Sequence, residues 1–377
     1  MKIRMAMLLA LLIVFDVLHA AGQEKYNKQV PMMHMKGLLR SVETIPLPLE
    51  GWIDHITVDL KNQHLFISGE YSKKVIVVDL ASGQVIHEIK NLGGNPRKPL
   101  FDARNNLVWV DLGNNTLVGI DANTFEVTKT VEFTGGKDAP TKDPDNGAFD
   151  AVRGLYYSGV GTTGPLDGSI EIVDTNTAKL VGSIPMHGVD PAGLVLDPSG
   201  KRLYVGMGDV VNGQSICKVV DTEKREVIAE WPISGGPQPH VAGLDPLHHR
   251  LFFGSRLEGG HQGEPGKLVV MDSDTGKVIQ VLDSVGGADE IFYDAPTKRI
   301  YFSGTTGSVA VFKQLDPDHY ELLGKVPTGA IAKSGLWIPE LKRYYSGIPR
   351  HLIQTPPYGP GDYITEESHL LVLEYVP

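Results

Sequence analysis

Charged and imidazole side chains recur along the sequence at similar intervals and would form a binding site if the fold brought them together. They are Asp54, Arg97, Asp145, His240 and Asp289, and four further polar residues lie one position after a member of the same series: His55, Lys98, Asn146 and Glu290. Carboxylate oxygens and an imidazole nitrogen can hold a divalent cation, and with an arginine they can orient a polar small molecule. The side chains expected to bind a ligand are Asp54, His55, Arg97, Asp145, His240, Asp289 and Glu290, and those expected to hold a metal ion within that set are Asp54, Asp145, His240 and Asp289.

The element that must position these residues is a repeat. A basic or polar residue followed by two apolar or aromatic residues begins at positions 64, 106, 154, 202, 250, 299 and 343. Examples are Arg202-Leu203-Tyr204, Arg250-Leu251-Phe252 and Arg299-Ile300-Tyr301. Seven copies at this spacing predict seven propeller blades of about 40–50 residues with four strands each.

Each copy has the same internal order. An aspartate closes a short strand a few residues before the repeated phrase, at Asp59, Asp102, Asp150, Asp197, Asp245 and Asp294. After the phrase comes a second alternating run such as Val75–Asp79, then a tight turn, then a run such as 84–90. Alternation with a period of two, bounded by Gly, Asp and Asn, is typical of short antiparallel strands. No segment has a helical period, so the predicted class is all-β.

The last copy lacks its fourth strand, because the chain ends at Pro377 directly after the third. Residues 38–45 read as an unassigned strand at the other end of the chain. Placing them beside the last blade removes two open sheet edges. We therefore predict a seven-bladed β-propeller of four-stranded antiparallel blades over residues 37–377, closed by an N-terminal strand that completes the last blade.

The candidate residues fall at one position of this repeat. Counting back five residues from each strand-closing aspartate gives 54, 97, 145, 192, 240 and 289, and Ser334 is the matching residue of the last copy. These positions should surround one end of the central channel, here called the channel mouth. The same face should carry the long loops 159–169, 207–215, 254–267 and 346–369, where recognition usually resides. The alternative is that these polar groups only satisfy one another, and that His240 is a structural hydrogen-bonding residue.

The repeats resemble those of YVTN-type, YncE-like bacterial propellers. The similarity is clearest in Gly286-Gly287-Ala288-Asp289-Glu290, in Lys298-Arg299-Ile300-Tyr301 and in Pro339-Glu340-Leu341. Because related seven-bladed propellers include lactonases, the resemblance implies a second possibility, a metal-assisted hydrolase. In that enzyme Asp54, Asp145, His240 and Asp289 would hold the cation, and Arg97 would steer an anionic substrate.

Composition and the start of the chain restrict the expected location, partners and cofactors of the protein. Lys2 and Arg4, an apolar run over 5–15, and Ala20-Ala21 predict a signal peptide over 1–20, followed by a flexible segment over 21–36. We expect a periplasmic or secreted monomer without a lipid anchor or membrane insertion after cleavage. The net charge of −10 disfavours nucleic acid as a partner, and the single Cys217 excludes an internal disulfide and a C-x-x-C-H haem site.

The leading hypothesis from the sequence is a binding module for a small polar ligand or a periplasmic or extracellular protein. The nucleophile motif G-x-S-x-G and the zinc motif H-E-x-x-H are both absent from the sequence. A protein partner would contact the loop 346–369 through Arg350, His351, Tyr358 and Tyr363. The adjacent residues His248 and His249 are expected on the surface of the opposite face, since neighbouring side chains in an extended chain diverge. No cofactor is certain, and one divalent metal ion is the candidate.

Overall fold

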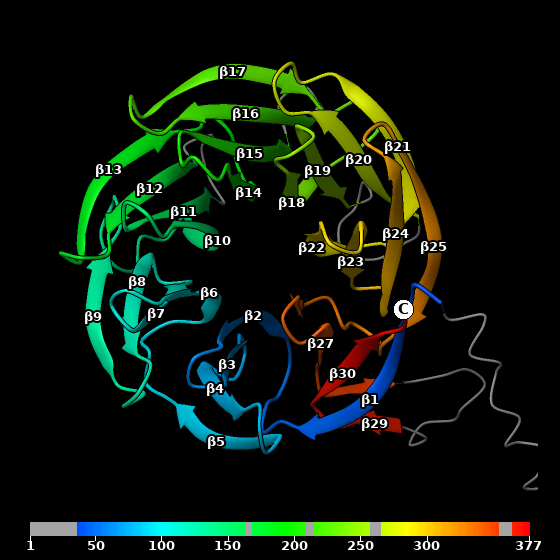
Figure 1. Ribbon diagram of the computed structural model, residues 1–377. Coiled ribbons are helices and arrows are strands. Elements are labelled where there is room, and N and C mark those ends of the chain that lie inside the picture. The colour runs from blue at the N-terminus through cyan, green and yellow to red at the C-terminus, as the bar shows by residue number, and fades with distance from the viewer. Residues whose placement is uncertain (1–35, 163–167, 209–214, 257–264, 354–363) are drawn as a thin grey trace, which may run out of the picture.

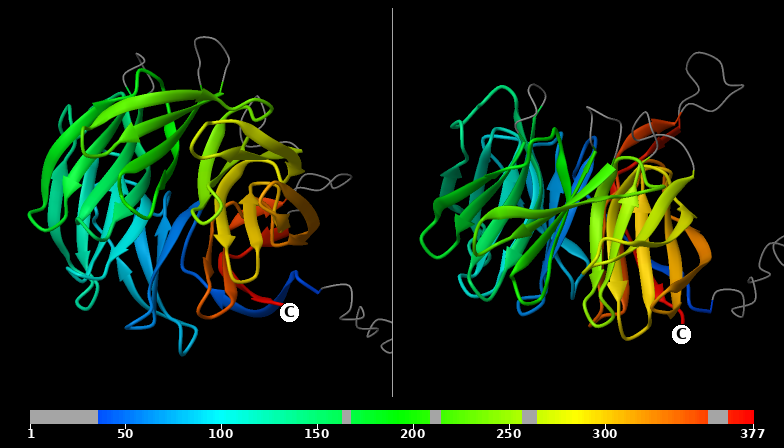
Figure 2. Two further views of the ribbon diagram at one scale, coloured as in Figure 1. Left: turned by 45° about the horizontal axis from the view of Figure 1, so that its top comes forward. Right: turned by 90° about the horizontal axis from the view of Figure 1, so that it is seen from above.

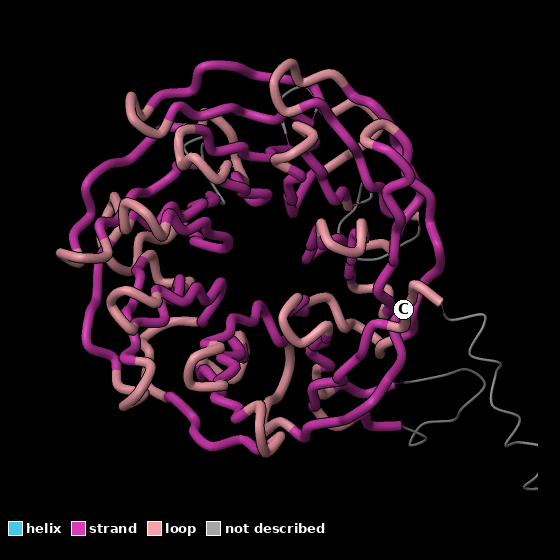
Figure 3. Tube along the Cα trace, in the orientation of Figure 1, coloured by secondary structure: helices cyan, strands magenta, loops and turns pink. Residues whose placement is uncertain are grey.

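The seven repeats form seven four-stranded antiparallel sheets arranged in a ring in the computed structural model (Figure 1). The structure describes residues 36–162, 168–208, 215–256, 265–353 and 364–377. Over these residues the chain contains strands and loops and no helix (Figure 3). The predicted all-β, seven-bladed propeller is confirmed.

Each blade is numbered here from the innermost strand outwards, and the strand bounds are as follows. Blade 1 is β2 (Ile53–Asp59), β3 (His64–Gly69), β4 (Lys74–Asp79) and β5 (Gln84–Ile89); blade 2 is β6 (Pro96–Asp102), β7 (Leu107–Leu112), β8 (Thr116–Asp121) and β9 (Val127–Glu132). Blade 3 is β10 (Lys142–Asp150), β11 (Leu155–Thr162), β12 (Ser169–Asp174) and β13 (Lys179–Pro185); blade 4 is β14 (Pro191–Leu196), β15 (Arg202–Gly208), β16 (Ser215–Asp221) and β17 (Glu226–Pro232). Blade 5 is β18 (Pro239–Asp245), β19 (Arg250–Ser255), β20 (Gly266–Asp272) and β21 (Val278–Ser284); blade 6 is β22 (Ala288–Asp294), β23 (Arg299–Gly304), β24 (Ser308–Asp316) and β25 (His319–Pro327). Blade 7 is β26 (Gly335–Ile338), β27 (Arg343–Ile348), β30 (His369–Tyr375) and β1 (Leu39–Pro46).

The repeated phrase opens the second strand of every blade, and in blades 1 to 6 an aspartate ends the first strand or directly follows it. The Asp59 carboxylate, for example, accepts hydrogen bonds from the backbone N–H groups of Lys61 and Asn62 at 3.0 and 3.1 Å. Asp150 receives the same pair of bonds from Val152 and Arg153, both at 2.9 Å. A short carboxylate that accepts bonds from the residues just beyond it favours a turn over further strand, so the aspartate fixes the strand end.

The core lies between neighbouring blades. The cluster between blades 5 and 6, for instance, joins Phe252 and Leu268 of one blade to Phe302 and Phe312 of the next. The strand aromatics that follow the repeated basic residue are buried at these blade interfaces, as their alternation predicts: Tyr156, Tyr204, Phe252 and Tyr301. Cys217 is a free, fully buried thiol whose pKa is raised by burial, so it packs as a small apolar side chain.

The N-terminal strand closes the ring as predicted. β1 pairs antiparallel with β30 from Leu39 opposite Tyr375 to Pro46 opposite His369, with one bulge near Ser41. It thereby becomes the outermost strand of blade 7, beside the red C-terminal strand in Figure 1. A further two-stranded hairpin, β28 (His351–Ile353) with β29 (Ile364–Glu366), belongs to no blade and extends from one face of the ring (Figure 2).

The predicted signal peptide 1–20 and almost all of the predicted segment 21–36 lie outside the described residues. Within the described ranges, no helix has the length and apolar character that a membrane crossing requires.

One buried carboxyl gives the fold a testable pH dependence. Asp111 of β7 is fully buried at the interface with blade 3, where it accepts hydrogen bonds from the Tyr156 hydroxyl (2.6 Å) and the Ser158 hydroxyl (2.8 Å). Burial raises its pKa from an ordinary 3.8 to about 7, although the two hydrogen bonds act in the opposite direction. Its contribution to stability is therefore greatest below about pH 4 and is lost as the pH rises to about 7.

We expect Asp111→Asn to remove this dependence. The free energy of unfolding of the variant should increase relative to that of the wild type by up to about 4 kcal/mol between about pH 4 and pH 8, since a shift of roughly three pKa units acts on the wild type alone. Urea unfolding of both proteins across this range measures the difference. Parallel stability curves for the two proteins would contradict the prediction.

Candidate functional site

A β-bulge at the start of the innermost strands directs the recurring residues toward the axis. In β10, Pro144 pairs with Val160 and Asn146 with Gly159, which leaves Asp145 as the extra residue. The same shift leaves one extra residue in three other innermost strands, namely Ala192, His240 and Asp289. In β2 and β6, two residues lie opposite one residue of the neighbouring strand, and these are the pairs 54–55 and 97–98. A bulge breaks the regular alternation of side chains and re-aims the extra one. Residues that are roughly one repeat apart in sequence therefore meet at the axis.

At the centre of the site, a lysine of blade 7 bridges two buried aspartates. The Lys333 ammonium lies 3.0 Å from Asp54 Oδ1 and 3.2 Å from Asp289 Oδ2. Ser334, the predicted equivalent position of blade 7, donates a hydrogen bond to Asp289 at 3.0 Å. Burial alone would raise the pKa of Asp54 and of Asp289, but Lys333 and neighbouring basic groups hold both pKa values below the ordinary range. Both aspartates are thus ionised and paired.

His55 and Glu290 form a second buried pair. His55 Nδ1 contacts Glu290 Oε1, and the Lys98 ammonium lies 3.1 Å from that carboxylate and 3.2 Å from the same His55 nitrogen. Burial and Lys98 oppose a charge on His55, but Glu290 and Asp54 outweigh them and raise its pKa above the ordinary value. The polar groups of His55, Glu290 and Lys98 are thus largely paired with one another.

Arg97 organises the acidic side of the site. Its guanidinium lies 2.7 Å from Glu70, 3.3 Å from Asp143, 3.7 Å from Asp145 and 3.9 Å from Asp54. Because so many carboxylates share one arginine, none of them is fully neutralised. Burial, followed by repulsion from Asp54, raises the pKa of Glu70 to about 7 despite this arginine.

His240 is the neutral member of the group. Its Nε2 lies 3.7 Å from both Asp145 and Asp289, and its side chain is buried. Burial and the positive charges of Arg256 and Lys333 hold its pKa well below the ordinary value. His240 can therefore accept or donate a hydrogen bond at neutral pH without carrying a charge.

A cavity of about 520 Å³ opens above these groups. Its walls combine acidic, basic and aromatic side chains with two residues at the end of β11: Trp52, Glu70, Tyr71, Arg97, Asp143, Asp145, Gly161, Thr162, Val189, Asp190, His240, Arg256 and Lys333. Trp52 and Tyr71 meet edge to face with ring centroids 6.4 Å apart. A cavity of this size with a few convergent polar groups is of the kind that holds a small molecule.

The predicted metal ligands are only partly gathered into one group. Asp54, His55 and Asp289 offer ligand atoms within 4.8 Å of one another and could bind a metal. Asp145 and His240, the other two predicted ligands, are grouped with Arg97 and Asp289 instead. The ammonium of Lys333 lies against the two aspartates of the candidate group, so the protein supplies a cation of its own there.

Lys333, Arg256, Glu70 and Asp190 also belong to the site, and none of them was predicted from the sequence. Lys333 had a visible signal, because the residue before the axial position is apolar or proline in the other six blades: Ile53, Pro96, Pro144, Pro191, Pro239 and Ala288. A lysine at that place in the seventh copy is an exception. A comparison of the repeats, position by position, would therefore have found it.

The remaining predicted positions lie elsewhere. His248 is half-buried against Asp245 at 2.7 Å and His249 is exposed in the turn between β18 and β19, as expected for surface residues. Tyr358 and Tyr363 of the predicted contact loop fall outside the described residues, and only the backbone of His351 is described, in β28. Arg350 lies outside the channel mouth, where it pairs with Glu50 at 2.8 Å.

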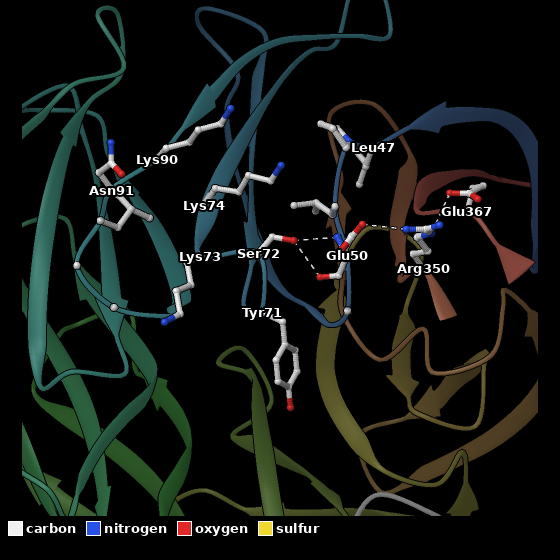
Figure 4. A pocket seen from close by; sticks show the side chains of 16 residues that line it. Leu47, Glu50, Tyr71, Ser72, Lys73, Lys74, Lys90, Asn91, Arg350 and Glu367 are labelled. Atoms are coloured by element: carbon white, nitrogen blue, oxygen red, sulfur yellow. Dashed lines mark hydrogen bonds and ion pairs between the residues drawn. The ribbon is translucent and has the colours of Figure 1, made fainter. Parts of the chain in front are cut away.

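A second hollow, of about 1050 Å³, lies where blade 1 meets the end of the closing strand (Figure 4). Ser72 joins two of its walls, because its hydroxyl donates to the Glu50 carbonyl at 2.9 Å and accepts from the Glu50 N–H at 2.8 Å. Lys74 and Lys90 of this hollow both pair with Glu88. Arg350 of the same hollow pairs with Glu50 and Glu367, so most of its charged groups have a counter-ion close by.

The fold and the channel mouth define the class of this protein: a seven-bladed β-propeller with ionic side chains gathered at one end of its axis. Within that class the chain is YncE-like, as the repeats indicated. It is 27% identical over 213 residues to the uncharacterized protein YncE of Escherichia coli O157:H7, covering 54% of each chain. It is 24% identical over 243 residues to YncE of Salmonella typhimurium, covering 62% of this chain and 63% of that protein.

The chain thus spans about half the length of the first of these relatives, and no family model matches it. Among solved structures, it is similar to a chain of Kuenenia stuttgartiensis hydrazine synthase, with a TM-score of 0.66, 17% identity and coverage of 80% and 94% of the two chains. It is also similar to a chain of a mitotic checkpoint complex, with a TM-score of 0.68, 11% identity and coverage of 89% and 92%. At such low identity these similarities support the fold alone.

Proposed function

We propose that this protein is an extracytoplasmic binding module that holds a small polar ligand in the cavity at the channel mouth. The observation that carries the proposal is the cavity of about 520 Å³, whose charged walls come from the innermost strands and inter-strand connections of several blades. The order of basic, apolar and small residues over positions 1–21 supports a location outside the cytoplasm.

The rigidity of the surroundings favours binding. Asp54, Asp289, His55 and His240 are each less than one-tenth exposed, and their contacts hold them in place before any ligand arrives. Groups that are ordered in advance lose little conformational entropy on binding. A protein partner remains the alternative occupant of this face, with its contact in the loop 346–369.

A metal-assisted hydrolase is the weaker candidate. It would need Asp54 and Asp289 free to ligate a cation, whereas both are engaged by Lys333 and Asp289 also by Arg256 at 3.0 Å. A metal ion would have to displace these buried, paired basic groups, although Asp54 Oδ2 accepts no hydrogen bond from the described residues. We therefore assign no catalytic residue.

Filling the cavity tests the proposal. Gly161 lines it, and a Cβ there meets Asp190 at no less than 3.4 Å, so a larger side chain can enter the cavity without backbone strain. We expect Gly161→Phe to keep the fold and to abolish binding of any ligand found by native mass spectrometry of the wild type with a panel of amino acids, amines, sugars and dicarboxylates. Gly208→Phe is the control, since a Cβ at Gly208 has nothing within 4 Å. Binding that survives Gly161→Phe would place the site elsewhere.

A further inference from the structure

The carboxylates at the channel mouth outnumber its permanently charged basic groups. Among the described residues, four carboxyl groups line the cavity and two lie directly behind it: Glu70, Asp143, Asp145, Asp190, Asp54 and Asp289. The basic groups facing them are Arg97, Arg256 and Lys333, while His240 is neutral. Adding the neighbouring trio of His55, Lys98 and Glu290 gives seven acidic groups against at most five basic ones. The cavity thus has an excess of negative charge.

The basic groups are already engaged, so an anionic ligand would have to compete for them. Lys333 contacts two aspartates, and Arg256 donates to Asp289 and to the carbonyl of Ala288, both at 3.0 Å. Arg97 is shared among four carboxylates, and its Nε, which has no acceptor, is shielded from solvent. An anion would thus meet occupied donors and unneutralised carboxylates.

The acidic groups show the effect of this crowding. Asp190 is exposed by area but lies within the concave mouth, where partial desolvation and then the charge of Asp145 raise its pKa to about 6. Burial and the charge of Asp145 also raise the pKa of Asp143, although Arg97 opposes this shift. Carboxyl groups that repel one another gain from a positive charge placed among them.

The site already holds one ammonium group, that of Lys333. Lys333 Nζ is held by Asp54 and Asp289 and lies 5.2 Å from the centre of the Trp52 ring. The adjoining Tyr71 is 61% exposed and lines the same cavity as Glu70 and Asp143. Carboxylates beside an aromatic ring are the groups that bind organic cations. The arrangement around Lys333 therefore shows how a second ammonium could be held.

We propose that the channel mouth selects a small organic cation, a primary amine whose ammonium lies among Glu70, Asp143 and Asp190 and whose hydrocarbon part packs on Tyr71. This inference rests on the proposed function, because it names the class of ligand for that cavity. Metal ions fit less well, since the cavity offers aromatic surface that a bare ion cannot use.

Two matched series of probes test the charge class on the full mature chain by calorimetry at low salt. The first is cadaverine, 1,5-pentanediol and glutarate; the second is phenethylamine, 2-phenylethanol and 3-phenylpropanoate. We expect the amine of at least one series to bind at least about tenfold more tightly than its alcohol and its carboxylate, since one ion pair of this kind is worth roughly one factor of ten or more. Tighter binding of a carboxylate or an alcohol would overturn the cation proposal while leaving a ligand site in place. Binding of none of the probes, with no ligand found in the wider panel either, would overturn the proposed function itself.

Variants locate the ammonium. The double variant Glu70→Gln, Asp190→Asn keeps the shapes of both side chains and should weaken the amine at least about tenfold. Asp274→Asn is the control, because Asp274 pairs with Arg202 in a surface turn outside the cavity. Binding of Zn²⁺ or Ca²⁺, together with no binding of any amine, would show that the site takes a metal ion and would refute the proposal. Unchanged amine affinity in the double variant, with an unchanged melting temperature, would also refute it.

Discussion

Removal of residues 37–46 is expected to leave a chain that is unfolded or aggregated at room temperature. β1 inserts Leu39 and Ile45 into two separate core clusters, where their exposures are 0% and 3%. Loss of each buried side chain costs about 2–5 kcal/mol, and the total stability of a domain is only about 5–15 kcal/mol. The deletion also exposes the edge of β30 along the whole register from His369 to Tyr375, which invites pairing with another molecule.

Sedimentation and thermal unfolding measure this outcome. Arg40→Ala on the same strand is the control, because Arg40 is exposed and its contact with Glu374, at 2.8 Å, is a surface ion pair worth about 0–1 kcal/mol. Leu39→Ala should be intermediate, with a loss of about 2–5 kcal/mol. A monomeric deletion variant with a cooperative transition near that of the wild type would show that closure is dispensable.

The second large effect is expected for Lys333→Met. Methionine matches the length of the lysine stem but removes the ammonium, so Asp54 and Asp289 lose their closest shared partner. Taking one member out of a buried ion pair typically costs about 3–5 kcal/mol. Adding Asp54→Asn to Lys333→Met should restore part of this loss, because it removes one of the two buried charges. Denaturant unfolding of the single and double variants measures the coupling.

Lys218→Met is the matched control, since Lys218 pairs with the exposed Glu230 at 2.8 Å and its loss should cost about 1 kcal/mol or less. Lys333→Met should also gain stability from Zn²⁺ or Mn²⁺, which the wild type should not, because Asp54, His55 and Asp289 then lack their internal cation. A wild-type protein that gains as much from the metal would return the hydrolase hypothesis to consideration.

The fold could be predicted from the sequence because the repeats carry the same local sequence signals. The phrase that opens each second strand, the aspartate at the end of the first strand in blades 1 to 6 and the unmatched segment 38–45 are all local signals, and all have their expected places. The axial positions followed from the same alignment, since a β-bulge occurs at that point in six blades.

The rest of the site depends on positions that do not repeat in chemical type. Trp52, Asp143 and Asp190 all lie two residues before the axial position of their blades, where the other blades have Asn95, Gln238, Gly287 and Ala332. Glu70 and Arg256 both directly follow a second strand. Pattern alone could name these positions, but it could not tell that Lys333 pairs with Asp54 and Asp289, because a charge balance requires distances.

The pairing of β1 with β30 joins residues that are 334 positions apart, as the contact between Arg40 and Glu374 illustrates. During synthesis, β1 therefore has no partner until β30 has been made. Blades 1 to 6 can each form from contiguous sequence meanwhile, since their strands are consecutive hairpins. The seventh blade can therefore be completed only when β30 has been made. A chain that terminates earlier keeps two unpaired strand edges, which expose it to proteases and chaperones.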